Sequence, residues 1–312
     1  MRTAVLEGPH KFVIRDIPKP IPKADEVLIK VAACGVCHSE MPSWEGKFNN
    51  FPSRIGHEVS GFIEEVGSQV ESLKVGQPVT VFTDKEGYSE YIAVKAPYVI
   101  PLGPDVLVPY ALGEPVGCVV NGVLRAGIQM HDTVVLVGTG FMGQIMLQMV
   151  LRSAKQVIAV DTRDSALKMA RQLGVEHCIN PIGEDAVEIV KELTGGQGAD
   201  CVIELTGNQQ GLDLATKLTR IRGRLVIFGF HVGQRNIDMF TWNWRGLDVV
   251  NAHERDPMVY TSGIRIGMDL MQHGLISLNS LITHEYSLEE INEAFATASD
   301  RKDNFIKAVI RP

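Results

Sequence analysis

Residues 133–161 contain the stretch Thr133-Val-Val-Leu-Val-Gly138-Thr-Gly140-Phe-Met-Gly143-Gln-Ile-Met-Leu-Gln-Met-Val150, and further on Gln156-Val-Ile-Ala-Val-Asp161. An apolar, β-branched run that breaks at three glycines and resumes with helical spacing predicts a strand, a tight turn and a helix. The second apolar run predicts another buried strand. This order is typical of one half of a dinucleotide-binding fold.

Each of the three glycines has a physical role in such a turn. Gly138 permits the tight turn, Gly140 lets the backbone approach a pyrophosphate, and Gly143 allows the helix to pack closely on the strand. Phe141 and Met142 open the helix, where free backbone amides face an anion. We therefore expect these five residues to bind the cofactor.

Asp161 follows eighteen residues after Gly143, at the tip of the second strand. A carboxylate there would accept hydrogen bonds from the adenosine ribose hydroxyls, and it would repel a ribose phosphate. This pattern favours NAD over NADP. Arg163 lies close enough in the sequence to offset the repulsion, so NADP stays open.

Length and composition limit the classes of protein that fit. With 312 residues the chain can hold two domains, and its 21% charged residues with a net charge of -7 disfavour nucleic acid as a partner. The N-terminus lacks the pattern of a secretory signal, and no apolar run reaches membrane-spanning length. We expect a cytoplasmic protein with no membrane partner.

Residues 1 to about 110 have the sequence pattern of an all-β barrel or sandwich, because short apolar runs alternate with Pro, Gly, Asp and Lys. The predicted strands are Phe12–Ile14, Val27–Ala32, Phe62–Ile63, Pro78–Phe82 and Tyr91–Val94.

Three places outside the nucleotide-binding stretch carry metal-ligand chemistry: Cys34-Gly-Val-Cys37-His-Ser-Glu40, Gly56-His57-Glu58 and Gly113-Glu114-Pro115. Thiolate, imidazole and carboxylate are the ligand types that Zn²⁺ prefers, and a catalytic zinc needs three or four of them with one exchangeable position.

Other interpretations of these residues exist. Taken alone, Cys37 fits a small core hydrophobe and His57 an ordinary hydrogen-bonded histidine. The spacing of Cys34 and Cys37 also fits a redox dithiol or, with the histidine that follows, attachment of a c-type haem. The β-rich context and the missing export signal disfavour these two. Five cysteines in a long chain do not suggest a disulfide framework, and Cys178 and Cys201, on predicted buried strands, are most simply core residues.

The order of these motifs resembles the zinc-dependent medium-chain dehydrogenase/reductases of the alcohol and sorbitol dehydrogenase type. The likeness runs through nearly the whole chain and includes Gly61-Phe-Ile-Glu-Glu-Val-Gly67 and Gly87-Tyr-Ser-Glu-Tyr91. The resemblance implies an α/β fold: a Rossmann-type doubly wound parallel sheet, residues 123–252, plus a β-rich, GroES-like catalytic domain formed by residues 1–122 and 253–312.

The same resemblance implies roles for single residues. Cys37, His57 and Glu114 would bind one catalytic zinc ion, with Glu58 as a further ligand or a carboxylate close behind. Ser39 would hydrogen-bond the substrate alcohol, so Cys37, Ser39, His57 and Glu58 form the predicted catalytic set. Two further assignments concern the neighbours of Ser39: Glu40 would orient His57, and His38 would touch the cofactor pyrophosphate.

The sequence departs from the family in two places. Only Thr83-Asp-Lys-Glu86 separates Phe82 from Gly87, where longer members insert a lobe with four cysteines around a structural zinc, so we expect no second zinc. The family's proton-relay histidine would fall near Met41-Pro42, so that relay cannot be carried over.

The rest of the nucleotide domain alternates helices and strands, and the loops at the carboxyl ends of the strands should line the cofactor crevice. We therefore expect the crevice to be lined by Thr206, Gly207, Phe228 and Gly229. By resemblance, Asn251 is expected beside the nicotinamide. Trp242 and Trp244 are expected in a loop before the last strand. By resemblance alone, that sheet edge suggests a homodimer.

The predicted function is a zinc-dependent oxidoreductase that transfers a hydride between NAD and a small-molecule secondary alcohol, a polyol, sugar or cyclitol, and its ketone. Two other interpretations stay open: a zinc-free, NADP-dependent quinone or enoyl reductase, and a non-catalytic nucleotide-binding protein on the same scaffold.

Overall fold

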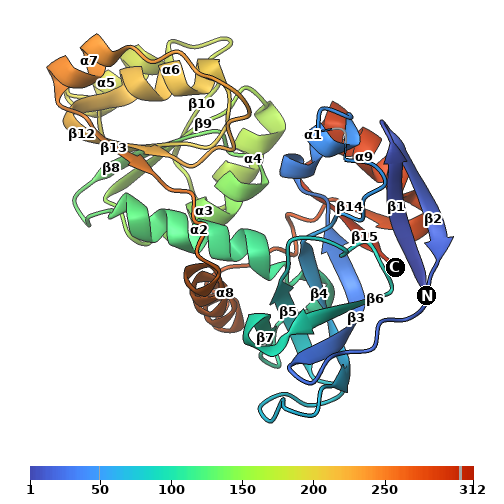
Figure 1. Ribbon diagram of the computed structural model, residues 1–312. Coiled ribbons are helices and arrows are strands. Elements are labelled where there is room, and N and C mark those ends of the chain that lie inside the picture. The colour runs from blue at the N-terminus through green and yellow to red at the C-terminus, as the bar shows by residue number, and fades with distance from the viewer. Residues whose placement is uncertain (49, 302–303) are drawn as a thin grey trace. The chain divides into compact units, whose positions relative to one another are not determined.

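The computed structural model describes residues 1–48, 50–301 and 304–312. The chain divides into two compact units, one formed by Met1–Gly117 with Asp256–Pro312 and the other by Cys118–Arg255 (Figure 1). The sequence placed the changes of domain at residues 122/123 and 252/253. The units of the structure change at 117/118, inside helix α2 (Gly113–Ala126), and at 255/256.

The second unit is a six-stranded parallel sheet in the order β10-β9-β8-β11-β12-β13. Helices α3 and α4 lie on one face of this sheet and α5 and α6 on the other (Figure 1). The doubly wound fold expected from the glycine-rich stretch is confirmed. The strands are β8 (Thr133–Val137), β9 (Gln156–Val160), β10 (His177–Ile179), β11 (Ala199–Glu204), β12 (Thr219–Ile227) and β13 (Asp248–Asn251), and the helices are α3 (Phe141–Val150), α4 (Asp164–Gln172), α5 (Ala186–Leu193) and α6 (Gln209–Leu218).

This sheet forms because its central strands β8, β9 and β11 are apolar and buried on both faces, as a sheet covered by helices on both sides requires. Val135, Ile158 and Val202 are fully buried, and α6 packs Leu212 and Ala215 into the same core. The strand order reverses between β8 and β11, where Gly138 and Thr206 face each other: a Cβ on Gly138 would lie 2.9 Å from the Thr206 side chain. Ligands of doubly wound sheets bind at the carboxyl ends of the strands beside such a reversal.

Two local expectations in this unit were wrong. Trp242 and Trp244 lie in a helix, α7 (Met239–Arg245), and not in a loop. The Asp238 side chain accepts a hydrogen bond from the amide of Thr241 at its start, and Gly246 ends it in the left-handed conformation. Cys178 lies on the edge strand β10 and is only half-buried, whereas Cys201 is fully buried as expected.

The first unit contains a seven-stranded, mainly antiparallel sheet in the order β14-β15-β3-β4-β5-β7, with β6 also paired to β3. A separate hairpin pairs β1 with β2. The β-rich domain expected here is confirmed. Its strands are β1 (Arg2–Gly8), β2 (Lys11–Asp16), β3 (Glu26–Gly35), β4 (Glu58–Val66), β5 (Pro78–Phe82), β6 (Tyr91–Lys95), β7 (Val99–Pro101), β14 (His284–Ser287) and β15 (Ala308–Arg311).

Three helices and four 3₁₀ turns complete the described part of this unit, and its core packs the beginning of the chain against its last part. The ring centroids of Phe12 and Phe295 are 4.8 Å apart. Ser287 and Glu290 form a capping box at the turn that leads into the last helix of the chain. The helices are α1 (Met41–Trp44), α8 (Pro257–Gln272) and α9 (Ile291–Asp300), with 3₁₀ turns η1 (His38–Glu40), η2 (Ala96–Tyr98), η3 (Val108–Tyr110) and η4 (Leu288–Glu290). Within the described ranges, no helix combines the length and apolarity needed to span a membrane.

Candidate active site

The site in the first unit is built by the pairing of β3 with β4. These strands run antiparallel, with Gly35 opposite Glu58. Cys37 lies two residues beyond the end of β3, and His57 lies directly before the first residue of β4. The strand register therefore brings together two segments that are twenty residues apart in the chain.

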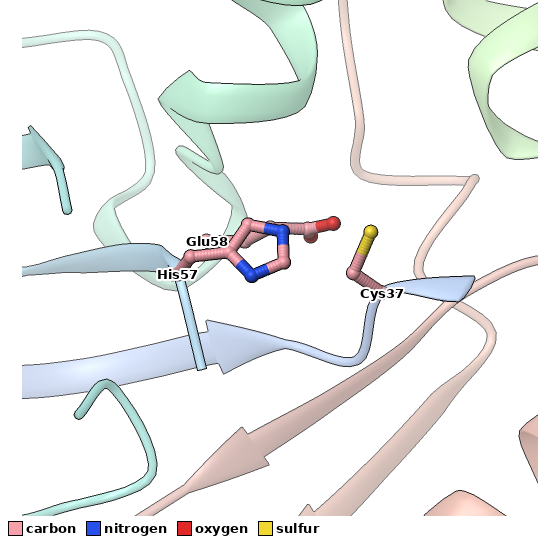
Figure 2. A group of neighbouring side chains, drawn as sticks. All are labelled: Cys37, His57 and Glu58. Carbon is pink, nitrogen blue, oxygen red and sulfur yellow. The ribbon is translucent and has the colours of Figure 1, made fainter. Parts of the chain in front are cut away.

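Cys37, His57 and Glu58 form a cluster in which one potential ligand atom of each residue lies within 4.8 Å of the others (Figure 2). The thiol and the imidazole are half-buried, and the carboxylate is buried. Thiolate, imidazole and carboxylate are the donors that zinc prefers. The residues present therefore fit a zinc ion.

His57 is oriented by the buried carboxylate of Glu40. Nδ1 of His57 lies 2.9 Å from Oε1 of Glu40, which also accepts the amide hydrogen of Gly56 at 2.8 Å. The hydroxyl of Tyr88 donates to the other oxygen of Glu40 at 2.6 Å. With Nδ1 engaged as a donor, Nε2 is left to face a metal.

The protonation of His57 reflects two opposing effects. Burial lowers the pKa of the imidazole, but the negative charges of Glu40 and Cys37 outweigh burial and raise it well above its usual value. Metal binding would therefore release a proton from this histidine.

Glu58 is paired with a lysine that sequence reasoning missed. Nζ of Lys307 lies 2.7 Å from Oε1 and 2.6 Å from Oε2 of Glu58, and both side chains are buried. Burial lowers the pKa of Lys307, but the neighbouring Glu58 and Cys37 raise it by a larger amount, so the net shift of this pKa is upward. Because 249 positions separate the two residues, no local pattern could have linked them.

Glu114, in the first turn of α2, is buried but does not belong to the cluster of three. Its Oε1 accepts a hydrogen bond from the hydroxyl of Tyr260, on α8, at 3.2 Å. Its charge also contributes to the raised pKa of Lys307. This carboxylate is therefore a neighbour of the cluster and is held by an aromatic side chain.

Ser39 and His38 lie in η1, directly after Cys37. The hydroxyl of Ser39 donates to Sγ of Cys37 at 3.2 Å, so this hydroxyl borders the cluster. His38 is exposed. The expected neighbours of the metal site on this segment are thus Ser39 and, through His57, Glu40.

In the second unit, the glycine-rich turn has the close packing that the sequence predicted. A Cβ on Gly143 would lie only 2.4 Å from the carbonyl oxygen of Gly138, so a side chain would separate α3 from β8. Gly140 is the N-cap of α3, and Phe141 and Met142 are its first two residues. The amides at this helix start suit an anion.

Asp161 comes directly after β9 and is held against this turn. Its Oδ2 accepts the amide hydrogen of Thr139 at 2.7 Å, and its Oδ1 accepts that of Arg163 at 2.9 Å. Nε of Arg163 lies 3.4 Å from the same Oδ1. A carboxylate and a guanidinium thus stand side by side where the adenosine ribose is expected.

The other predicted cofactor residues lie at the carboxyl ends of the next strands. Thr206 and Gly207 follow β11, Phe228 and Gly229 follow β12, and Asn251 ends β13. Asn251 is exposed and accepts the amide hydrogen of His253 at 3.0 Å.

Comparison with known proteins gives related enzymes along the whole chain. Residues 23–160 match the alcohol dehydrogenase GroES-like domain, and residues 142–265 match the zinc-binding dehydrogenase family. A sorbitol dehydrogenase of Bacillus subtilis (strain 168) is 28% identical and covers 100% of this chain and 97% of its own length. An L-threonine 3-dehydrogenase of Pyrococcus abyssi (strain GE5 / Orsay) is 30% identical, with 90% of this chain and 89% of its own length covered.

The fold is also that of solved structures. A protein of Sinorhizobium meliloti 1021, solved with NADP bound, superposes with a TM-score of 0.90 at 25% identity over 100% of this chain and 99% of that chain. The two domain matches, the identity to dehydrogenases over most of their length and this superposition agree with one another. The chain belongs to the zinc-type medium-chain dehydrogenase/reductase family.

Proposed function

We propose that this protein is a zinc-dependent dehydrogenase that transfers a hydride between a secondary alcohol and NAD. The convergence of Cys37, His57 and Glu58 within 4.8 Å, with Nδ1 of His57 held by Glu40, is the observation that carries the proposal. When bound, zinc would lower the pKa of the substrate hydroxyl as a Lewis acid, and NAD would accept the hydride at its nicotinamide ring.

The chain's own residues supply orientation and charge. Glu40 fixes the imidazole of His57, and Lys307 offsets the negative charge that Glu58 adds beside the thiolate of Cys37. Ser39, whose hydroxyl borders the thiol, is positioned to hydrogen-bond the substrate hydroxyl. Glu114 is proposed as a further metal carboxylate, presented by Tyr260.

We propose polyols, sugars or cyclitols as the substrate class. A site with one thiolate and two nearby carboxylates is more polar than one built from two thiolates. The similarity to sorbitol dehydrogenase supports the same class.

NAD is the proposed cofactor, with NADP as the competing one. Asp161 favours NAD because its carboxylate would accept from ribose hydroxyls. Arg163 beside it is the feature that would admit a phosphate. The proposed cofactor contacts are those of the glycine turn, Asp161 and His38, and of the loops at Thr206, Gly207, Phe228, Gly229 and Asn251.

Metal analysis followed by a dehydrogenase screen tests the proposal. Purified protein should carry one zinc per chain and reduce NAD faster than NADP with at least one secondary alcohol. Removal of zinc by a chelator should abolish activity, and added zinc should restore it. Full activity and one equivalent of zinc in Cys37→Ala would refute the ligand assignment, and tight NAD binding with no turnover would favour the non-catalytic alternative.

We also propose a homodimer formed through the edge strand β13 and helix α7. Among the described residues β13 ends the order of strands and pairs with β12. Phe240 and Trp244 on α7 are 74% and 80% exposed and stack on each other with centroids 6.0 Å apart. An exposed aromatic pair beside a sheet edge suits a second copy. Light scattering should show a dimer that Trp244→Glu converts to a monomer; an unchanged mass would refute this interface.

A further inference from the structure

A buried carboxylate in the second unit is unexplained by the proposed chemistry. Glu204 is the last residue of β11 and is fully buried. Its Oε1 accepts the amide hydrogens of Thr206 at 2.6 Å and Gly207 at 2.9 Å, together with the hydroxyl of Thr206. A buried carboxylate is costly unless it is hydrogen-bonded in this way.

The second oxygen of Glu204 binds a different loop. Nε2 of His231, four residues beyond the end of β12, donates to Oε2 of Glu204 at 2.8 Å. Nε of Arg235 donates to Nδ1 of His231 at 3.0 Å, so the imidazole is neutral, with its hydrogen on Nε2. The three side chains form a chain of hydrogen bonds, the Glu204–His231–Arg235 network.

Arg235 closes this network onto the loop from which it started. Its Nη2 donates to the carbonyl oxygen of Gly207 at 2.7 Å, and its Nη1 donates to the carbonyl oxygen of Val232 at 3.0 Å. The loop after β12 is therefore connected to the end of β11 and the loop that follows it at two points, through His231 to Glu204 and through Arg235 to Gly207. Gly229, in the loop after β12, packs directly against the loop after β11: a Cβ on it would approach Oε2 of Glu204 to 2.6 Å and the amide nitrogen of Gly207 to 2.3 Å.

The position of the network in the sheet indicates which half of a dinucleotide it concerns. The glycine turn and Asp161 follow β8 and β9, on one side of the strand reversal, where pyrophosphate and adenosine are expected. A dinucleotide extended across the reversal reaches the ends of β11 and β12 with its other half. Those ends are the loops that Glu204, His231 and Arg235 hold.

We infer that the Glu204–His231–Arg235 network is a positioning device for the nicotinamide half of the cofactor, acting by holding the loops at Thr206–Gly207 and Phe228–Gly229 in their binding conformation. This inference rests on the proposed binding of NAD. Loops that already hold their binding conformation bind the cofactor more tightly, because the apparent affinity is proportional to the fraction of molecules in that conformation.

Three variants separate this role from a general effect on folding. His231→Ala removes both hydrogen bonds of the imidazole, whereas His231→Gln keeps one donor and one acceptor in the side chain. His177→Ala, on the edge strand β10, is the control for removal of a half-buried histidine from the same sheet. Calorimetric titration with NADH and with ADP, which carries only the adenosine and pyrophosphate part, gives two affinities for each protein.

The expected result is a selective loss. His231→Ala should weaken NADH binding by about tenfold or more, as the loss of a hydrogen bond to a buried charge implies, and change ADP binding by less than about twofold. His231→Gln should recover most of the NADH affinity, and His177→Ala should change neither. Equal weakening of NADH and ADP, or no weakening of either, would overturn the inference. If the unaltered protein binds ADP but no NADH, the proposed function fails and the inference falls with it.

Discussion

Replacing Lys307 by methionine should destabilise the metal-free protein strongly, because it leaves the buried carboxylate of Glu58 without its partner. Nζ of Lys307 lies 2.6–2.7 Å from both carboxylate oxygens, and the side chains are 5% and 1% exposed. Removing one partner of a buried ion pair costs about 3–5 kcal/mol. For a unit of this size the loss corresponds to about 6–20 °C in melting temperature.

Two further arms make this experiment specific to charge. The double variant Glu58→Gln with Lys307→Met should recover most of the lost stability, because two neutral side chains leave no uncompensated charge. Zinc should stabilise Lys307→Met more than it stabilises the unaltered protein, because the cation replaces the missing positive charge beside Glu58. Lys191→Met, which breaks an exposed pair with Glu188, is the control and should leave the melting temperature unchanged.

Melting curves recorded with chelator and with zinc provide the measurement. Burial lowers the pKa of Lys307, but the negative charge of Glu58 raises it by more. The pKa of Lys307 in the folded protein therefore lies above its value in the unfolded chain. The stabilisation from the raised pKa of Lys307 is therefore complete at neutral pH and is lost as the pH rises through that pKa. A metal-free Lys307→Met protein that melts at the temperature of the unaltered protein at pH 7 would refute the reasoning, as would a double variant no more stable than the single one.

Three other substitutions probe the site. Glu40→Gln should weaken zinc binding by about 10–100-fold in a chelator competition, because Nδ1 of His57 loses its charged acceptor; unchanged affinity would show that Glu40 does not orient the ligand. Asp161→Ala should lower kcat/KM with NAD by about tenfold and lower it less with NADP, since Arg163 remains; an unchanged ratio would exclude Asp161 from cofactor choice. Tyr260→Phe should weaken zinc binding by up to about tenfold through Glu114, whereas Tyr98→Phe, in the same aromatic cluster, should not; equal effects would contradict the role of the Tyr260 hydroxyl.

Local patterns were enough to predict the nucleotide-binding half of the fold and to single out Cys37, His57 and Glu58, which the structure brings together; Glu114, predicted as the third ligand, lies outside that cluster. The glycines at 138, 140 and 143 specify the turn by themselves. Cys37 and His57 lie next to the ends of the paired strands β3 and β4, so the strand register brings them together. Helix α7 was missed although Asp238 and Gly246 mark its ends, because two tryptophans suggested a contact loop instead.

The residues that sequence reasoning missed are those whose partners lie far away in the chain. Lys307 opens an apolar C-terminal run and looks like an ordinary surface lysine until β15 pairs with β3. Glu204 ends a buried strand, and only the return of the chain after β12 brings His231 to it. Tertiary pairing, and not composition or spacing, assigns both residues a role.

The first unit is formed by two separate parts of the chain, and this determines the order in which the two units can fold during synthesis. Residues 118–255 are contiguous and can fold on the ribosome as soon as they emerge, whereas β3 gains its neighbour β15 only after residues 308–311 have been made. Lys307, next to that last strand, reaches Glu58 at the same late moment. A nascent chain therefore presents Cys37 and His57 before Lys307 has paired with Glu58, and the proposed metal site is complete only when the end of the chain closes the sheet.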